Sequence, residues 1–184
     1  MGRDTRTRIL DTALALFAAR GVEAVTVTEL EEGAGLSPGS GSFYRHFASK
    51  QDVLAAAVAR EIDRAEARRV PTAGTSDLGS EYRATLDALD DLRPLLALLV
   101  REGGRLPEVE RIRGVLAEGG ARIDAARLRD LMEAGTIPER DAEGVATAVM
   151  MALVGFHLAE RFFGGPVGVD RDRLVATLAS MVGT

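Results

Sequence analysis

Apolar residues recur every three or four positions along almost the whole chain, and no stretch alternates apolar and polar residues with a period of two. The first such series runs through Ile9, Leu10, Ala13, Leu14 and Phe17. Side chains at this spacing share one face of an α-helix, whereas a half-buried strand needs strict alternation. The sequence therefore predicts an all-α protein without a sheet.

Helix-ending and helix-starting residues follow the first series. Gly21 stands where a helix C-terminus favours a left-handed residue. Thr26 and Glu29 have the spacing of a capping box, in which a hydroxyl and a carboxylate satisfy the free N–H groups of a new helix. This second helix is short, because Gly33 and Gly35 end it.

Two further helix starts follow at once. Ser37 precedes a proline, and this pair predicts a third helix within Pro38–Phe47. Ser49, with Asp52 three residues later, predicts the cap of a fourth helix that continues to about Arg69. The breaker-rich segment VPTAGTSDLGS at 70–80 is the predicted domain boundary. Five further helices are expected at roughly 81–92, 94–102, 107–134, 138–163 and 170–182.

The composition excludes several classes of protein. The chain has no cysteine, which removes disulfides, thiolate metal sites and cysteine nucleophiles. It has two histidines and no His-x-x-x-His pair, nucleophile elbow or phosphate loop, so we expect no enzyme, no metal and no cofactor. No signal peptide is evident, and the longest apolar stretch, Val145–Leu158, is shorter than the roughly 20 residues that span a bilayer, so a cytoplasmic protein is expected.

Charge is distributed unevenly between the two parts of the chain. The net charge is -5, which by itself argues weakly against a nucleic-acid partner. Residues 1–70 hold ten basic and ten acidic residues, whereas residues 71–184 hold 13 and 18. Any DNA-binding face must therefore come from the local arrangement of the N-terminal part.

Three helices within about 45 residues, with a glycine in the turn at 34–36, have the outline of a helix-turn-helix module. Phe43 and Phe47, four residues apart, are the expected core anchors of the third helix. Lys50 places a positive charge in the first turn of the fourth helix, where a phosphate partner would offset its unfavourable position. Six other side chains can hydrogen-bond to phosphates or base edges, namely Ser37, Ser40, Ser42, Tyr44, Arg45 and His46.

Over Thr5–Leu54 the sequence resembles the TetR family of regulators. The resemblance runs through RILDTALALFAARG, VTVTEL and AGLSPGSGSFYRHFASKQDVL, and the segment FYRHFASK is its most specific part. It implies a dimer of nine or ten helices whose third helix enters the major groove and whose last two long helices pair across a two-fold axis. It also implies a palindromic DNA operator and a small-molecule effector bound in the C-terminal domain.

The resemblance assigns roles to individual residues. Tyr44, His46 and Lys50 resemble the phosphate-contacting residues of the family, and Thr26 resembles the phosphate contact that opens the second helix. The positions that face the groove or the bases correspond to Ser37, Pro38, Ser40, Ser42 and Arg45. The predicted domains are then 1–48 for DNA binding, 49–70 for a connecting helix and 71–184 for effector binding and dimerisation.

This chain departs from the family pattern in two places. The turn SPGSGSFY carries two additional residues and a second glycine, so the third helix is expected to begin late or to bulge. Glu31, Glu32 and Gly33 stand where the family more often has alanines. Carboxylates near DNA repel phosphate, and Gly33 costs about 1 kcal/mol of helix stability relative to Ala, so weaker or more salt-sensitive DNA binding is expected.

The C-terminal part offers candidate ligand and dimer residues, and each set also fits a plain protomer core. His157 on its apolar helix is more often a hydrogen-bonded core residue than a ligand contact. The candidate ligand-binding residues are Leu96, Val100, Met132, Met150, Leu153 and His157. The candidate dimer face consists of Val145, Val149, Phe156, Leu174 and Leu178.

Two functions from different classes fit these observations. The first is a ligand-responsive transcriptional regulator, more specifically a repressor, that binds its operator as a dimer. The alternative is a helical module that binds a small molecule or a protein and whose DNA-binding face is compromised by the glutamates and the longer turn. Salt dependence separates the two, because a DNA binder loses affinity with a log–log slope of about -0.9 per phosphate contacted.

Overall fold

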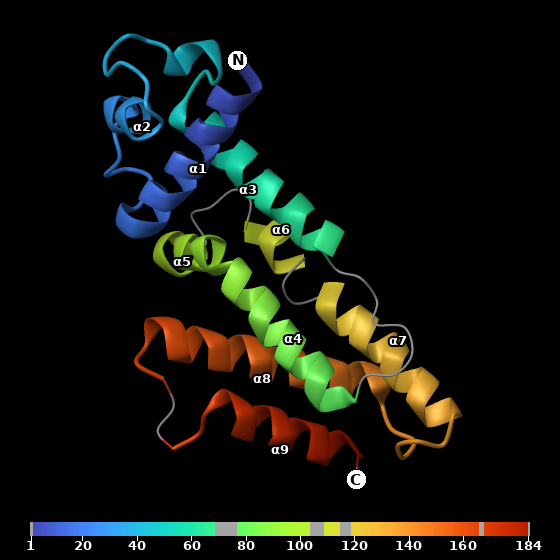
Figure 1. The fold of residues 1–184 in the computed structure, drawn as a ribbon. Helices are drawn as coiled ribbons and strands as arrows, with labels where there is room; N and C mark the ends of the chain where they lie inside the picture. Colours follow the sequence, from blue (N-terminus) through green and yellow to red (C-terminus); the bar gives the residue numbers. More distant parts are fainter. Residues whose placement is uncertain (1, 69–76, 104–108, 115–118, 166–167, 184) are drawn as a thin grey trace. The chain divides into compact units, whose positions relative to one another are not determined.

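The computed structural model describes residues 2–68, 77–103, 109–114, 119–165 and 168–183, and all regular elements in these ranges are helical (Figure 1). In chain order they are α1 (Gly2–Arg20), α2 (Val27–Gly33), the 3₁₀ helix η1 (Phe43–Arg45), α3 (Lys50–Arg68), α4 (Leu78–Asp91), α5 (Arg93–Glu102), α6 (Val109–Arg113), α7 (Gly120–Glu133), α8 (Ala142–Phe162) and α9 (Arg171–Gly183). The prediction of an all-α fold is confirmed.

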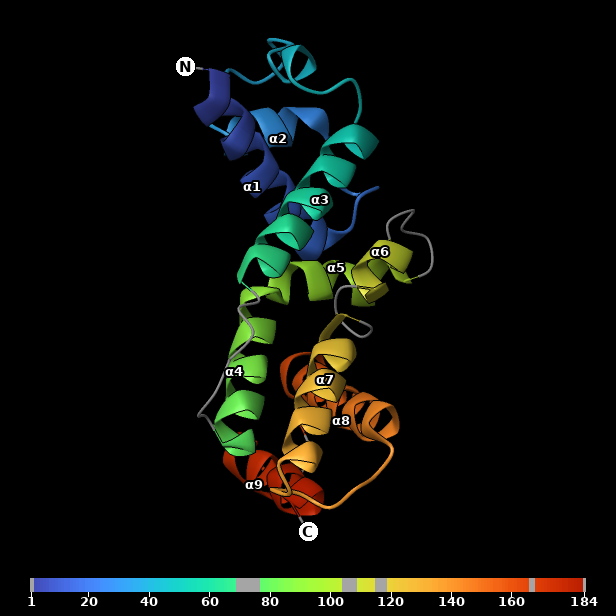
Figure 2. The same ribbon diagram turned by 90° about the vertical axis from the view of Figure 1, so that its right-hand side faces the viewer.

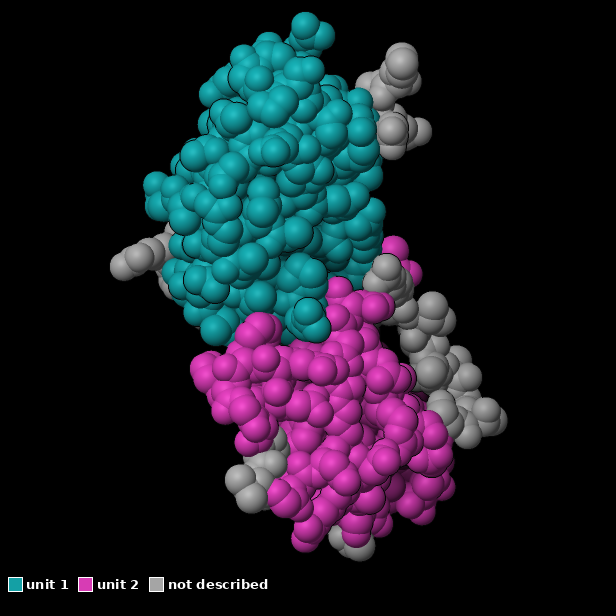
Figure 3. All heavy atoms as spheres, turned by 60° about the vertical axis from the view of Figure 1, so that its left-hand side comes forward, with its two compact units in different colours: residues 1–66, 92–112 teal, residues 67–91, 113–184 magenta. Residues whose placement is uncertain are grey.

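The chain divides into two compact units (Figure 3). Unit 1 contains Met1–Glu66 and Leu92–Ile112, and unit 2 contains Ala67–Asp91 and Arg113–Thr184. Unit 1 thus contains α5 in addition to the N-terminal helices. A single cut in the chain near residue 70 would therefore not separate the two units, because part of unit 1 follows the cut. The expected boundary at 70–80 lies partly outside the described residues, and its last residues, from Leu78, already belong to α4.

Unit 1 is built around α1, which packs against α2 and α5. Its helix α3 is joined to α1 by Arg60, whose guanidinium donates to Asp11 Oδ1 at 2.6 Å and to the Thr7 carbonyl at 3.4 Å. The apolar side chains that the helical periodicity placed on one face are buried here: Ile9, Ala13, Phe17, Leu30, Phe43, Val53, Ala57, Val58 and Ile62. Burial of this face accounts for the association of these short helices.

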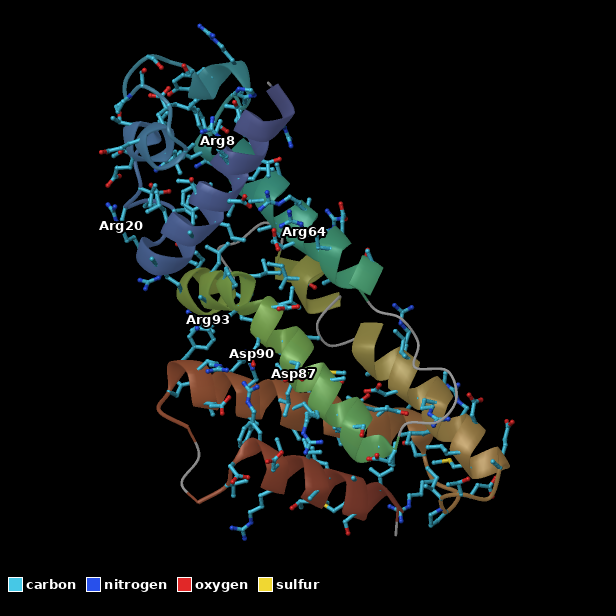
Figure 4. All side chains as sticks on the ribbon, in the orientation of Figure 1. Arg8, Arg20, Arg64, Asp87, Asp90 and Arg93 are labelled. Atoms are coloured by element: carbon cyan, nitrogen blue, oxygen red, sulfur yellow. The ribbon has the colours of Figure 1, made fainter. Side chains whose placement is uncertain are left out.

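In unit 2, α8 packs against α7 and α4, and α9 packs against α4 (Figures 1 and 2). A charged cluster fastens these helices at one point: Asp90 of α4 accepts from Arg161 of α8 at 2.6 Å and from Arg171 of α9 at 2.6 Å. Figure 4 shows the Asp90 side chain on the side of α4 that faces α8. Arg171 also donates to Glu160, so the cluster joins three helices through two arginines.

The helix boundaries expected downstream need three corrections. The helix expected over 107–134 is two helices, α6 and α7, among the described residues, which makes six helices after α3 where five were expected. The helix expected from Pro138 begins only at Ala142, because Asp141 caps it by accepting from the Gly144 N–H at 3.0 Å.

The third correction concerns the length of the apolar stretch expected over Val145–Leu158, which lies within the longer helix α8. α8 has 21 residues and is long and apolar enough to cross a membrane by length and composition. Its buried residues include Ala146, Val149, Met150 and Leu153, which pack within unit 2. Packing in the core of unit 2 therefore accounts for the buried side of α8, which makes up 39% of the apolar window.

Candidate nucleic-acid interface

The start of α2 is fixed by the capping box that the sequence predicts. The Glu29 N–H donates to Thr26 Oγ1 at 3.2 Å, and the Thr26 N–H donates to Glu29 Oε2 at 2.8 Å. Arg20 at the end of α1, labelled in Figure 4, adds an ion pair to Glu29 at 2.6 Å. The backbone hydrogen bond from Thr26 and the bond from Arg20 lower the pKa of the Glu29 carboxyl to about 2. Thr26 is exposed, but its hydroxyl donates to Glu29 Oε2 at 2.8 Å and is part of this box.

The turn after α2 is longer than one that joins two α-helices directly. Gly35, Gly39 and Gly41 all have positive φ, at 67°, 73° and 70°. A left-handed residue cannot continue a right-handed helix, so Gly39 and Gly41 prevent an α-helix from beginning at Pro38. The third helix expected within Pro38–Phe47 is instead the single 3₁₀ turn η1. It begins late, as the two additional residues predict.

One buried carboxylate organises this turn. Glu31 of α2 accepts the Gly39 N–H on Oε2 at 2.7 Å and the Phe43 N–H on Oε1 at 3.0 Å. Only 1% of Glu31 is exposed. Glu31 therefore does not lie on the exposed surface, where a direct meeting with DNA phosphates was expected, because its carboxylate is buried on two backbone amides. Glu32 is the exposed member of the pair.

Most of the residues expected to meet DNA lie on the turn, in η1 or directly after it, whereas Thr26 caps α2 and Lys50 begins α3. Phe43 is fully buried and Phe47 nearly so, as anchors should be, while Tyr44 between them is 60% exposed. The Tyr44 ring stands edge-on to the Phe43 ring, with a centroid distance of 5.4 Å. The other predicted residues of this segment differ in exposure. Exposed side chains are those of Ser37, Pro38, Ser40 and Arg45, and half-buried ones are those of Ser42 and His46.

Lys50 faces the segment between α1 and α2. Its ammonium donates to the carbonyls of Val22 at 2.9 Å, Val25 at 2.8 Å and Glu23 at 3.4 Å. An ammonium has three donors, and here each has a backbone acceptor. Lys50 thus has a structural role that sequence reasoning missed, since no sequence pattern pairs a lysine with carbonyls more than 20 residues earlier.

Two arginines of α1 lie near the same face and were not among the predicted DNA contacts. The Arg6 guanidinium lies over the Phe47 ring, 4.8 Å from its centroid. Arg8 approaches the turn, because a Cβ built on Gly35 would lie 3.1 Å from its Nη1. Both side chains are exposed. The available signal was the presence of two arginines in the first helix of the predicted helix-turn-helix module.

The six candidate ligand residues are divided between the two units. Leu96 and Val100 belong to unit 1, where Leu96 is buried and Val100 is 41% exposed. Met150 and Leu153 are core residues of unit 2, and Met132 is half-buried. A cavity of about 10 Å³ in unit 2 is lined instead by Leu78, Glu81, Tyr82, Asp124, Arg127, Leu128, Ala146 and Val149. This volume holds no more than about one water.

His157 is fully buried beside the charged cluster. Its Nδ1 lies 4.0 Å from Asp90 Oδ1, and neither ring nitrogen has a hydrogen-bond partner among the described residues. Burial lowers the pKa of the His157 imidazole below its ordinary value. The sequence expectation of a core histidine is thus correct for burial, and the described residues supply no protein partner for its ring nitrogens.

The candidate dimer residues are mostly covered within the protomer. Val149 and Phe156 are 5% and 9% exposed, because they face the core of unit 2, while Val145, Leu174 and Leu178 are half-buried. The solvent-facing side of α8 carries different residues, with Ala148 and Gly155 exposed and Met151 exposed by 46%. A partner would meet these residues first.

The N-terminal residues match a known family. Residues 9–57 match the family described as "Bacterial regulatory proteins, tetR family". This range holds the capping box, the glycine turn, η1 and the start of α3. The structural features described above and the family match therefore fall on the same segment.

Three known proteins are similar to the chain to different extents. The HTH-type transcriptional repressor KstR2 of Mycobacterium tuberculosis is 47% identical over 49 residues, which is 27% of this chain and 24% of KstR2, so the match spans about a quarter of that relative. The HTH-type transcriptional regulator UidR of Escherichia coli is 28% identical over 137 residues, covering 72% of this chain and 69% of UidR.

Similarity of fold extends over the whole chain. A solved transcriptional regulator from Saccharomonospora viridis, in complex with choline, superposes with a TM-score of 0.75 at 22% identity and covers 96% of this chain and 94% of its own. This likeness concerns the fold, with its N-terminal helix-turn-helix part and its helical C-terminal part.

Proposed function

Because residues 9–57 match the tetR family of bacterial regulatory proteins, we propose that this chain is a DNA-binding transcriptional regulator, specifically a repressor. It binds a palindromic operator as a homodimer and leaves it when a small-molecule effector binds. One observation carries the proposal: the family match coincides with a segment whose polar side chains are displayed on a turn held by a buried core. KstR2, a named repressor, is 47% identical to this chain over 49 residues.

The displayed side chains have the chemistry of a groove contact. Tyr44, Arg45 and His46 offer donors to phosphate, and Ser37 and Ser40 offer small hydroxyls that fit either phosphates or base edges. Pro38 and Ser42 belong to the same turn, and Thr26 lies at the start of α2. Lys50 contributes by holding the segment that precedes α2, whether or not a phosphate also reaches it.

Dimerisation supplies the symmetry that a palindrome requires. Two copies related by a two-fold axis place two recognition turns one or more helical repeats of DNA apart. We propose the exposed side of α8, with Ala148, Met151 and Gly155, as part of the contact, together with the half-buried Val145 of α8 and Leu174 and Leu178 of α9.

The effector site belongs to unit 2 in this proposal. The choline-bound regulator of similar fold supports a small-molecule ligand as a class. The cavity beside Tyr82 is too small for such a ligand, so an effector that binds there requires a conformation in which the helices around it separate. A ligand that prefers this conformation shifts the population toward it and thereby lowers affinity for the operator.

We propose that the protein acts as a regulator in the cytoplasm and that it is not an enzyme. Operator DNA lies in the bacterial cytoplasm, and the relatives are regulators by name. The described residues contain no group of three or more histidine, aspartate or glutamate side chains placed to hold a metal ion. The contacts described above serve binding and packing.

The test is a fluorescence-anisotropy titration of wild type against the DNA flanking its own gene at two salt concentrations. Arg45→Ala is compared with Arg64→Ala, which removes the same charge from α3. We expect Arg45→Ala to weaken binding by about tenfold and to reduce the salt slope by about 1, while Arg64→Ala binds as wild type does. Absence of wild-type binding to this DNA and to a random-sequence library would favour the alternative, a helical ligand-binding module.

A further inference from the structure

Glu31 is an unusual residue for the middle of a short helix in a packed domain. It is one of two buried polar or charged residues among the described ones, the other being His157. Burial of a carboxylate is unfavourable unless hydrogen bonds replace its water. Two backbone amides, from Gly39 and Phe43, supply these bonds.

The two amides lie at the two ends of the additional turn. Gly39 opens its glycine-rich part, and Phe43 begins η1. Between them, Gly41 has a φ of 70°, and Ser40 Oγ lies 2.7 Å from Ser42 Oγ. Each oxygen of Glu31 therefore holds one end of a segment that would otherwise have the conformational freedom of glycine.

The segment held in this way carries the side chains that face outward. Ser40 lies inside it, and Tyr44 and Arg45 follow directly on η1. Because the Phe43 side chain is fully buried and its N–H is bound to Glu31, η1 is fixed from both its side chain and its backbone. The direction of Tyr44 and Arg45 depends on this anchoring.

We propose that Glu31 is a positioning residue for sequence recognition, which preorganises the glycine turn for a DNA groove without touching DNA. This inference rests on the proposed DNA-binding function. A turn that is already ordered loses less conformational entropy when it binds DNA. This difference matters most where hydroxyls and amides must fit base edges. Binding to phosphates alone depends on charge and tolerates a looser turn.

Glu31→Gln is the sharpest variant, because it keeps the size of the side chain. One oxygen becomes an NH₂ group, which confronts a backbone N–H and cannot accept from it. Glu32→Gln is the matched control, since it removes the same charge from the exposed neighbouring residue. Amide hydrogen exchange of Gly39 and Phe43, measured without DNA, reports whether their hydrogen bonds to residue 31 persist. Exchange of Ile9 and Phe17 in α1 reports whether the domain remains folded.

The DNA probe is the duplex that wild type enriches most strongly from a random-sequence library, compared with a scrambled duplex. In Glu31→Gln we expect at least one of the two turn amides to exchange about tenfold faster, with α1 unchanged. Affinity for the enriched duplex falls about tenfold, while affinity for the scrambled duplex stays within about twofold. A variant that was merely less folded would lose both affinities in the same proportion.

The outcomes separate this inference from the proposed function. If wild type binds and Glu31→Gln discriminates between duplexes as well as Glu32→Gln does, the positioning role is overturned and the proposed function stands. Unchanged exchange at both turn amides also overturns it. If wild type enriches no sequence, the proposed function fails and the inference fails with it.

Discussion

Lys50 joins the first turn of α3 to the segment between α1 and α2. Its three hydrogen bonds to the carbonyls of Val22, Glu23 and Val25 cap a stretch of backbone that has no helical partners. A charged donor of this kind contributes more than a neutral one, and its removal takes a donor away from the partly buried carbonyls of Val22 and Val25. Lys50 therefore contributes to the stability of the DNA-binding part as well as to any contact with phosphate.

We predict that Lys50→Ala lowers the free energy of unfolding by about 1–3 kcal/mol and also weakens DNA binding. Urea denaturation followed by circular dichroism measures the first effect. The exposed Arg45→Ala serves as the comparison and is expected to change stability by less than about 0.5 kcal/mol. A loss of DNA affinity in Lys50→Ala with no change in the urea midpoint would show that the phosphate contact is its only role.

Glu29 couples the start of α2 to pH. Hydrogen bonds from Thr26 and Arg20 lower the pKa of its carboxyl from 4.5 to about 2, so the folded protein holds the ionised form more firmly than the unfolded chain does. A depressed pKa gives stability that is complete above pH 4.5 and is lost as the pH falls toward about 2.

We predict that Glu29→Gln flattens this acid limb. Between pH 4.5 and about 2, wild type should lose stability more steeply than the variant, as measured by urea midpoints across this range. Glu32→Gln controls for the loss of one carboxyl from α2. Equal slopes for wild type and Glu29→Gln would mean that the capping box does not set the acid sensitivity.

At the scale of the elements, Gly33 decides how closely α1 and α2 approach. A Cβ built on Gly33 would lie 2.6 Å from Thr12 Cγ2, which is closer than two carbon atoms can come unless the Thr12 side chain or the helices shift. Helix propensity alone favours alanine at this position by about 1 kcal/mol. Packing opposes that preference here, so the glycine belongs to the interface between the two helices.

We predict that Gly33→Ala destabilises the protein by about 1–3 kcal/mol, against its helix propensity. Thr12→Ser removes the methyl group that the new Cβ would meet, so the double variant should recover most of the loss. A double-mutant cycle in urea measures the coupling between the two sites. A stabilised Gly33→Ala would show that α1 and α2 can separate at no cost.

At the scale of the whole molecule, assembly depends on which side of α8 remains open. The side that faces α7 and α4 is used within unit 2, and the other side exposes Met151 among small residues such as Ala148 and Gly155. Small residues allow close approach of a second helix, and methionine adapts to the gaps that remain. This combination suits a helix that packs on its own copy.

We predict that Met151→Asp turns the dimer into a monomer at concentrations where wild type is dimeric, because a carboxylate would be buried between the copies. Sedimentation equilibrium measures the assembly state. Ile123→Asp makes the same change at a residue of α7 that is 40% exposed and should leave the dimer intact. An unchanged assembly state in Met151→Asp would move the interface away from this side of α8.

The all-α fold, the capping box at Thr26 and the Ser49 cap could be predicted because each depends on residues within about four positions of one another. The same local pattern identified Phe43 and Phe47 as anchors and marked the segment that matches the tetR family. These features are properties of helical spacing and of short-range hydrogen bonds, so the sequence alone determines them.

Tertiary structure decided what the same residues do when distant parts of the chain meet. The charge of Glu31 suggested repulsion of DNA, yet its burial on two amides of the turn gives it an organising role. Lys50 bonds to carbonyls that lie 25 to 28 residues earlier, and Val149 and Phe156 face the core of unit 2. Burial and long-range hydrogen bonds depend on how helices pack, and helical periodicity gives the face of a helix but not the neighbour that covers it.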